Sequence, residues 1–175
     1  MITKPIKYFF SILLLVAVFS SCQQSEYDQL SSQISDMEKQ LFEEKAGIID
    51  KKEAANMIQY YVKFVDTYPE DEKSAEYLFK AADISINVFH SQNTVKLFDR
   101  VIKEYPYYEK APQALFLKAF TYENYLNKMD KAKESYKLFL SKYPDHSFAN
   151  DAQVSLNNLG KSPEEIIKAF NESRQ

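Results

Sequence analysis

The stretch from Ala132 to Pro144 reads AKESYKLFLSKYP and carries the pattern on which the fold prediction depends. Its tyrosine–proline end occurs twice earlier in the chain. The three pairs, which recur at nearly equal intervals, are Tyr68-Pro69, Tyr105-Pro106 and Tyr143-Pro144. Proline cannot continue a helix and disfavours helical geometry in the residue before it. Each pair is therefore predicted to end one helix of a repeated unit.

Apolar residues precede each pair at the spacing of a helix face. They are Ile58, Tyr61, Phe64 and Val65; Val95, Phe98, Val101 and Ile102; and Ala132, Tyr136, Phe139 and Leu140. A polar turn and a second apolar segment follow each pair. Small residues such as Ala81 and Ala119 recur in these segments, at the interval that separates the second pair from the third. The pattern predicts an all-α chain of paired helices, in which small side chains let neighbouring helices approach closely.

These positions resemble the tetratricopeptide repeat. Ala132 and Tyr136 precede Pro144 at the two offsets where the family has a small and an aromatic residue. The same offsets before the other two prolines are occupied by Thr94 and Phe98 and by Met57 and Tyr61. The resemblance covers roughly residues 51–173 and implies a right-handed solenoid of helix hairpins.

The repeats also depart from the family pattern. Thr94 and Met57 stand where alanine is usual, the family's tryptophan is absent, and Ala82 and Phe120 lie near the position of its central glycine. Repeats that end in Tyr-Pro are similar to those of outer-membrane assembly lipoproteins and of periplasmic proteins of the Tol-Pal system.

The N-terminus has the order of a secretory signal: Lys4 and Lys7, then an apolar run over residues 8–19. That run would form a helix of roughly 18 Å, too short for a bilayer core of about 30 Å. Two serines and Cys22 follow, which resembles the bacterial lipobox, although Phe19 stands where leucine is usual. The resemblance implies that residues 1–21 are cleaved and that Cys22 is lipidated. The alternative is an uncleaved membrane helix with an incidental cysteine.

The resemblance divides the chain into a signal peptide (1–21), a lipidated N-terminal segment (22–48) and a repeat domain (49–175). Gln23 and Gln24, rather than aspartate, follow Cys22. This favours the outer over the inner membrane as the site of anchoring.

A heptad-like stripe follows the cysteine. Its apolar residues, separated by 3, 4, 3 and 4 positions, are Tyr27, Leu30, Ile34, Met37 and Leu41. Two interpretations remain open: a coiled coil that makes the protein a homo-oligomer, or a single helix that packs on its own repeat domain. Gly47 is expected to end this segment, and Asp50 to cap the next helix.

Composition excludes several classes of function. The net charge is -3, and removal of Lys4 and Lys7 brings it to -5, so nucleic acid is not an expected partner. The chain has one cysteine and two histidines, His90 and His146, which are expected in turns between helices. No spacing typical of a metal site, a cofactor site or a catalytic group is present. We expect neither a catalytic nor a metal site, no cofactor, and a protein that is not an enzyme.

The expected site is therefore a protein-binding groove lined by the first helix of each repeat. By the resemblance, the groove positions are Phe79, Asp83, Asn87, Leu117, Thr121, Asn124 and Tyr125. The apolar members could equally be core residues. A second candidate contact is the adjacent pair Tyr107-Tyr108 in a loop.

The chain is expected to end with a capping helix. Gly160 is a predicted C′ residue, and Ser162, Pro163 and Glu165 have the order of an N-cap, N1 and capping-box residue. The predicted function is a membrane-anchored adaptor or scaffold for an unidentified envelope protein. The alternative is a structural protein that self-associates through residues 27–41.

Overall fold

The computed structural model describes residues 26–44 and 50–172, and the chain divides into two units, residues 1–49 and 50–175. In the first unit, residues 26–38 are helical and continue into a π-helix, η1 (Lys39–Glu44). Leu30, Ile34 and Leu41 are buried, and Tyr27 and Met37 are half-buried. The predicted signal peptide, Cys22 and the break at Gly47 lie outside the described residues.

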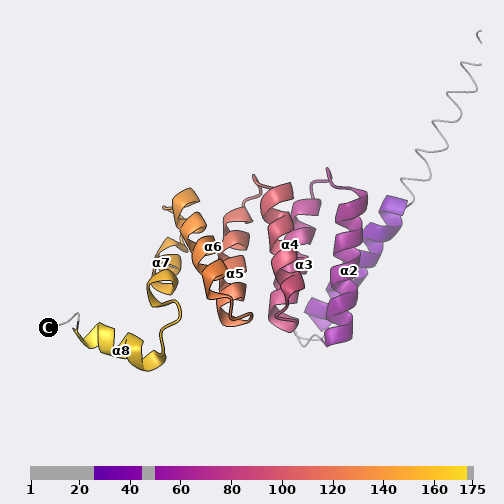
Figure 1. The fold of residues 1–175 in the computed structure, drawn as a ribbon. Helices are drawn as coiled ribbons and strands as arrows, with labels where there is room; N and C mark the ends of the chain where they lie inside the picture. The colour runs from indigo at the N-terminus through magenta and orange to yellow at the C-terminus, as the bar shows by residue number, and fades with distance from the viewer. Residues whose placement is uncertain (1–25, 45–49, 173–175) are drawn as a thin grey trace, which may run out of the picture. The chain divides into compact units, whose positions relative to one another are not determined.

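The second unit is built from seven α-helices, and none of the described residues is in a β-strand. The helices are α2 (Lys51–Thr67), α3 (Ser74–Val88), α4 (Gln92–Glu104), α5 (Ala111–Asn124), α6 (Met129–Lys142), α7 (Ala149–Asn158) and α8 (Pro163–Glu172). From α2 to α7, each helix packs chiefly against the helix before and after it in the chain (Figure 1). Such nearest-neighbour packing is typical of a helical solenoid and confirms the predicted all-α repeat fold.

The three tyrosine–proline pairs end three helices, as predicted. Tyr68, Tyr105 and Tyr143 are the C-cap residues of α2, α4 and α6, with φ of -130°, -128° and -135° and ψ of 60°, 59° and 56°. In each cap the tyrosine amide donates to the carbonyl oxygen four residues earlier, at 2.8–3.1 Å. The following proline keeps the tyrosine out of helical geometry, so the same turn forms three times.

The core contains the residues at the two repeat offsets. The smaller residues Met57, Thr94 and Ala132 and the aromatic residues Tyr61, Phe98 and Tyr136 all have no exposed surface. A small residue next to a large ring lets two helices approach while the ring fills the remaining space. This packing agrees with the tetratricopeptide-like geometry expected from the sequence.

The predicted helix ends are also present. Asp50 Oδ1 accepts hydrogen bonds from the amides of Lys52 (2.7 Å) and Glu53 (2.9 Å). At α8, the Ser162 amide donates to Glu165 Oε2 at 2.7 Å, and the Glu165 amide donates to Ser162 Oγ at 3.2 Å. Gly160 has φ of 77°, a left-handed conformation that costs glycine little. However, α8 buries none of its residues, so it does not cover the end of the array.

Candidate protein-binding site

The predicted groove residues lie on α3 and on α5 with its C-cap, the first helices of two successive hairpins. A spacing of four places Phe79, Asp83 and Asn87 on one face of α3, and Leu117, Thr121 and Tyr125 on the equivalent face of α5. The structure buries two of the seven, Phe79 and Thr121, and half-buries Leu117. The four exposed members are Asp83, Asn87, Asn124 and Tyr125.

The two buried members have structural contacts. The ring of Phe79 packs edge-on against Phe98 (centroids 6.4 Å apart) and Tyr108 (6.2 Å), and Lys110 Nζ lies 5.5 Å from the ring centre. Thr121 Oγ1 donates to the Leu117 carbonyl at 2.7 Å. Phe79 and Thr121 therefore shape the face from within, and a partner would meet the exposed residues.

Asp83 is the acidic residue of this face. Partial desolvation raises the pKa of Asp83 above its usual value, and the nearby positive charge of Lys110 opposes that rise. The carboxylate is thus less well stabilised than one in bulk water. A cationic or hydrogen-bond-donating group from a partner would stabilise its charged form.

The two amides of the face are held by their own helices. Asn87 Nδ2 donates to the Asp83 carbonyl at 2.8 Å, and Asn124 Nδ2 donates to the Phe120 carbonyl at 3.2 Å. These bonds fix the orientation of each amide and leave its oxygen as an acceptor. Acceptors fixed in this way suit the N–H groups of an extended peptide.

An aromatic stack joins the two hairpins. The His90 ring, in the turn after α3, stacks on Tyr125 at the end of α5, with centroids 4.0 Å apart and an interplanar angle of 24°. Phe120 meets Tyr125 edge-on at 5.8 Å. His90 was predicted only as a turn residue. Its contact with Tyr125 has no signal in the sequence, because neither the repeat nor the helix period relates positions 90 and 125.

The second candidate contact is confirmed as a loop, but its two tyrosines differ. Tyr107 is 99% exposed, whereas Tyr108 is half-buried against Phe79. Burial raises the pKa of Tyr108, and the charges of Glu76 and Glu109 add to the rise. Only Tyr107 is fully available for contact.

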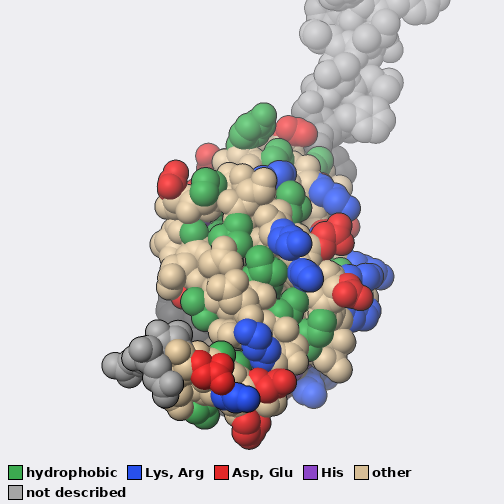
Figure 2. Space-filling model, turned by 60° about the vertical axis from the view of Figure 1, so that its left-hand side comes forward, with side chains coloured by type: hydrophobic (Ala, Val, Ile, Leu, Met, Phe, Trp, Pro, Cys, Tyr) green, Lys and Arg blue, Asp and Glu red, His purple; other side chains and the backbone are tan. Residues whose placement is uncertain are grey.

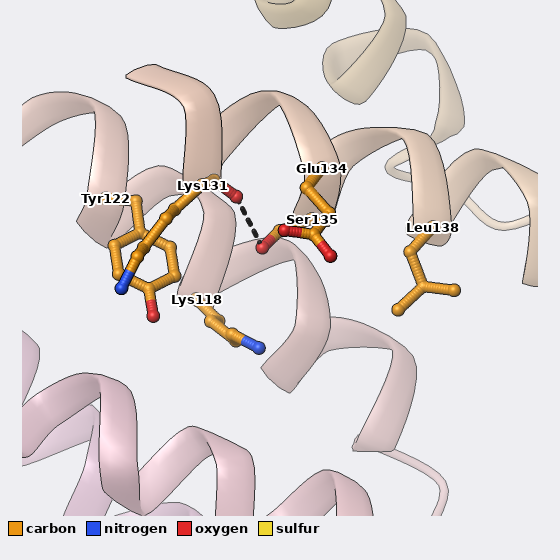
Figure 3. Close-up of a pocket in the computed structure, with 6 residues that line it drawn as sticks. All are labelled: Lys118, Tyr122, Lys131, Glu134, Ser135 and Leu138. Carbon is orange, nitrogen blue, oxygen red and sulfur yellow. Dashed lines mark hydrogen bonds between the residues drawn. The ribbon is translucent and has the colours of Figure 1, made fainter. Parts of the chain in front are cut away.

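A separate pocket lies between α5 and α6, with a volume of about 230 Å³. Figure 3 shows its lining residues: Lys118, Tyr122, Lys131, Glu134, Ser135 and Leu138. Lys131 Nζ lies 5.7 Å from the centre of the Tyr122 ring, and Ser135 Oγ donates to the Lys131 carbonyl at 2.8 Å. Lys118 Nζ forms an ion pair with Asp99 Oδ1 of α4 at 2.7 Å. The pocket is therefore charged, but its lysine–aspartate pair compensates part of that charge.

A second hollow of about 310 Å³ lies between α2, α3 and α4 and is more apolar. Ile58, Phe89 and Leu97 supply its largest apolar side chains. Neither hollow was predicted. Each depends on how successive helices are spaced, which the sequence pattern does not give.

The other predicted turn histidine, His146, contacts its own turn and the end of α6. His146 Nδ1 accepts from the Phe148 amide at 3.2 Å, and its ring packs edge-on against Phe139. Within residues 26–44 and 50–172, no three histidine, cysteine or acidic side chains gather in a way that could hold a metal ion. No helix in the same ranges combines the length and apolar character needed to cross a bilayer.

The comparisons with known proteins agree with this geometry. Residues 113–146, which span most of α5, all of α6 and the third tyrosine–proline turn, match the family model of the tetratricopeptide repeat. The comparison with curated proteins found no match. Tetratricopeptide repeats are interaction modules that bind other proteins on an extended face. The chain thus contains a tetratricopeptide repeat within an all-helical array whose packing fits the solenoid that such repeats build.

Proposed function

We propose that this protein is a lipid-anchored adaptor of the bacterial cell envelope, which holds a partner protein on the face formed by α3 and α5. The partner is an envelope protein, as for the assembly and Tol-Pal types of repeat protein that the tyrosine–proline units resemble. Lipid on Cys22 anchors the chain to a membrane, with the outer membrane favoured over the inner. The role is binding rather than catalysis, because tetratricopeptide repeats act as interaction modules.

The observation that carries the proposal is the set of polar and aromatic side chains exposed on successive hairpins. Asp83 and Asn87 come from the first hairpin, Asn124 and Tyr125 from the second, and the His90–Tyr125 stack bridges the two. Amide oxygens and a carboxylate accept hydrogen bonds from a peptide backbone. An exposed aromatic pair gives a partner's apolar or cationic side chain a flat contact surface.

The anchor is supported by the order of charged, apolar and small residues before Cys22. Each buried methylene contributes about 0.8 kcal/mol, and two acyl chains together give stable attachment. Attachment would hold the repeat domain near one membrane and raise the local concentration of partners in that membrane.

The first experiment is crosslinking of the native protein in intact cells, followed by mass spectrometry of captured partners. We expect one or two envelope proteins, which are lost when Cys22→Ser removes the anchor. The variant Tyr125→Ala should lose the same partners, because it removes the aromatic pair. The matched control is Lys103→Ala, an exposed change on α4, which should retain them. Equal capture by all four proteins would contradict the proposed site.

The anchor needs its own assay. Cells fed an alkyne-tagged fatty acid should label the wild-type chain and leave the Cys22→Ser chain unlabelled. A Cys22→Ser chain that is still labelled would refute lipidation at this residue, independently of the partner experiment.

The alternative function is a structural role through self-association of residues 27–41. The 3, 4, 3, 4 spacing of the apolar stripe favours it, because this is the spacing of coiled-coil contacts. In that case the crosslinked peptides would come from the protein itself, joined through residues 27–41. Leu30→Asp and Ile34→Asp would then abolish the self-crosslinks.

A further inference from the structure

The last helix pair of the array differs from the two before it at one backbone position. Phe89 and Tyr125, which end α3 and α5, have near-helical φ and ψ of -111° and -28° and of -116° and -30°. Leu159, which ends α7, has φ of -55° and ψ of 122°, an extended conformation. Because the chain leaves α7 extended, α8 points away from α7 (Figure 1, left).

This course leaves apolar side chains exposed on both helices. Val154 of α7 is 50% exposed, and Ile167 of α8 is 61% exposed. Figure 2 turns the α7–α8 end of the array toward the viewer and shows hydrophobic side chains on its surface, with acidic and basic side chains intermixed at its lower edge. Apolar side chains exposed on two successive helices would lose contact with water if a partner covered them.

The repeat indicates which surfaces match. In the preceding hairpin, Phe116 of α5 packs against Tyr136 of α6, with centroids 5.8 Å apart. Val154 follows Phe116 by the same interval that separates Tyr143 from Tyr105, so it holds the same position on α7. On α8, Ile166 and Phe170 repeat the four-residue spacing of Ala132 and Tyr136. By this comparison, Val154 of α7 would pack against Phe170 of a helix such as α8, as Phe116 packs against Tyr136.

Charge favours the same pairing. Successive residues of a helix are about 100° apart, so Lys133 and Lys137 share one flank of α6, about 100–160° around the helix from the pocket residues Lys131 and Leu138. A helix docked on α7 in the repeat geometry would lie along this lysine flank. The charged residues of α8 are mostly acidic. They are three glutamates (Glu164, Glu165 and Glu172) and one lysine (Lys168).

We infer that two copies of the chain exchange α8, so that each α8 docks on α7 and beside the lysine flank of α6 in the other copy. The extended Leu159 directs α8 away from its own α7, and a second copy offers the same matching surface. The connections of the two preceding hairpins, residues 89–91 and 125–128, are no longer than residues 159–162, so the conformation of Leu159 and not the length of the connection sets the course of α8. A reciprocal exchange has two-fold symmetry and stops at a dimer.

This interface goes beyond the adaptor role and uses helices other than α3 and α5, so the two proposals are tested separately. The assay is disulfide crosslinking of full-length chains in cells, in a Cys22→Ser background that removes the chain's one native cysteine. One tagged copy carries Val154→Cys and a differently tagged copy carries Phe170→Cys. We expect mild oxidation to give a covalent heterodimer, which neither copy gives alone.

Two further variants in the Phe170→Cys copy test the contact itself. Ile167→Asp places a charge on the apolar face of α8 and should lower the heterodimer yield at least tenfold. Asn171→Ala, its matched control at an exposed uncharged residue of α8, should leave the yield unchanged. Neither change should affect folding, since α8 buries none of its residues in its own chain.

Three outcomes would overturn the exchange. A chain that carries both cysteines and forms only an internal disulfide, with no heterodimer in the mixture, would show that α8 closes on its own α7. The absence of any crosslink would show that α7 does not receive α8. An equal yield with Ile167→Asp would show that the disulfide reports chance collisions.

Discussion

The hairpin of α3 and α4 and the hairpin of α5 and α6 follow the same backbone course, yet different polar groups join their helices. In the first, Ser85 Oγ and Thr94 Oγ1 lie 2.7 Å apart in the core. In the second, the equivalent positions hold Glu123 and Ala132, and the hydroxyl of Tyr136 donates to Glu123 Oε2 at 2.7 Å. Thr94 Oγ1 also lies 3.3 Å from the Ser85 carbonyl oxygen, so the two hairpins are hydrogen-bonded at different positions.

The difference shows how one repeat tolerates divergence. The aromatic ring, Phe98 or Tyr136, keeps its buried position, because the volume between the helices must be filled. The hydrogen bond between the helices is made by Thr94, at the small-residue position, in the first hairpin and by the hydroxyl of Tyr136 in the second. Thr94, which stands where alanine is usual, therefore has Ser85 as its hydrogen-bond partner. The hydroxyl of Tyr136 has Glu123 as its partner.

Among the variants that remove a hydrogen bond, the largest effect is expected in the first hairpin. Thr94→Val should lower the free energy of unfolding by about 1–3 kcal/mol, because the buried Ser85 hydroxyl loses its partner. The Ser91 amide, which donates to Thr94 Oγ1 at 3.2 Å, also loses its acceptor. Urea-induced unfolding measures the change.

The control for this prediction removes both hydroxyls. The double variant Ser85→Ala/Thr94→Val leaves no buried hydroxyl without a partner and should unfold closer to the wild type than the single variant does. If the double variant were the less stable of the two, the hydroxyl pair would not explain the effect.

A smaller effect on the free energy of unfolding is expected when Tyr136 of the second hairpin is replaced by phenylalanine, the residue at the equivalent position 98 of the first. Tyr136→Phe removes the bond to Glu123, which is partly exposed and regains water, so the cost should be about 0.5–1.5 kcal/mol. Unfolding in urea at neutral pH measures it. Phe98→Ala, which empties a ring-sized site, should cost more, about 3–5 kcal/mol, and serves as the reference for lost packing.

The same tyrosine gives a pH signature. Burial and then the hydrogen bond to Glu123 raise the pKa of Tyr136 above that of an unfolded tyrosine, about 10. The folded state thus holds this proton more tightly, so the contribution is fully present below about pH 10 and is lost as the pH rises further. Tyr136→Phe should lose less stability than the wild type between about pH 9 and 11. Parallel curves for the two proteins would contradict the assignment.

The smallest effect is expected on the proposed binding face, where Asp83 of the first hairpin has Thr121 as its equivalent. The pKa of Asp83 is raised by desolvation, so its contribution is present below the unfolded value, about 3.9, and is lost as the pH rises. At neutral pH the charged group therefore costs stability. Asp83→Asn should raise the stability slightly, by under about 0.5 kcal/mol, because the side chain is exposed and screened.

Thermal unfolding at about pH 7 and about pH 3 measures this difference. The gain from Asp83→Asn should be present at the higher pH and vanish at the lower one, where both side chains are neutral. A gain of equal size at both pH values would point to a cause other than charge.

The sequence was sufficient for the parts of the fold that repeat. The tyrosine–proline pairs predicted three helix ends, because proline restricts the residue directly before it. The two positions at fixed offsets before each proline predicted three pairs of core residues. The pattern could not give which residues of the proposed binding face are exposed. Phe79 and Thr121 stand at groove positions but are buried. Phe79 packs against Phe98 and Tyr108, and Thr121 Oγ1 donates to the carbonyl of Leu117 in its own helix.

Two other features were beyond a sequence argument for physical reasons. The His90–Tyr125 stack depends on how a turn of one hairpin meets the helix end of the next, a distance that no residue pattern encodes. The course of α8 depends on the ψ angle of Leu159, and leucine is equally acceptable in helical and extended backbone. The caps at Asp50 and Ser162 were predictable because they depend on neighbours three residues away or fewer.

The hydroxyl of Tyr105 donates to the carbonyl of Pro69 at 2.9 Å, so one turn of the array rests on the turn before it. Ser74 and Ala111 each follow such a turn at the same distance, which makes residues 74–110 a segment whose two ends meet equivalent surroundings. A tandem duplication of that segment would find a matching proline carbonyl and a matching helix at each junction. Each added unit would therefore lengthen the array by one hairpin, and the interior would need no other change.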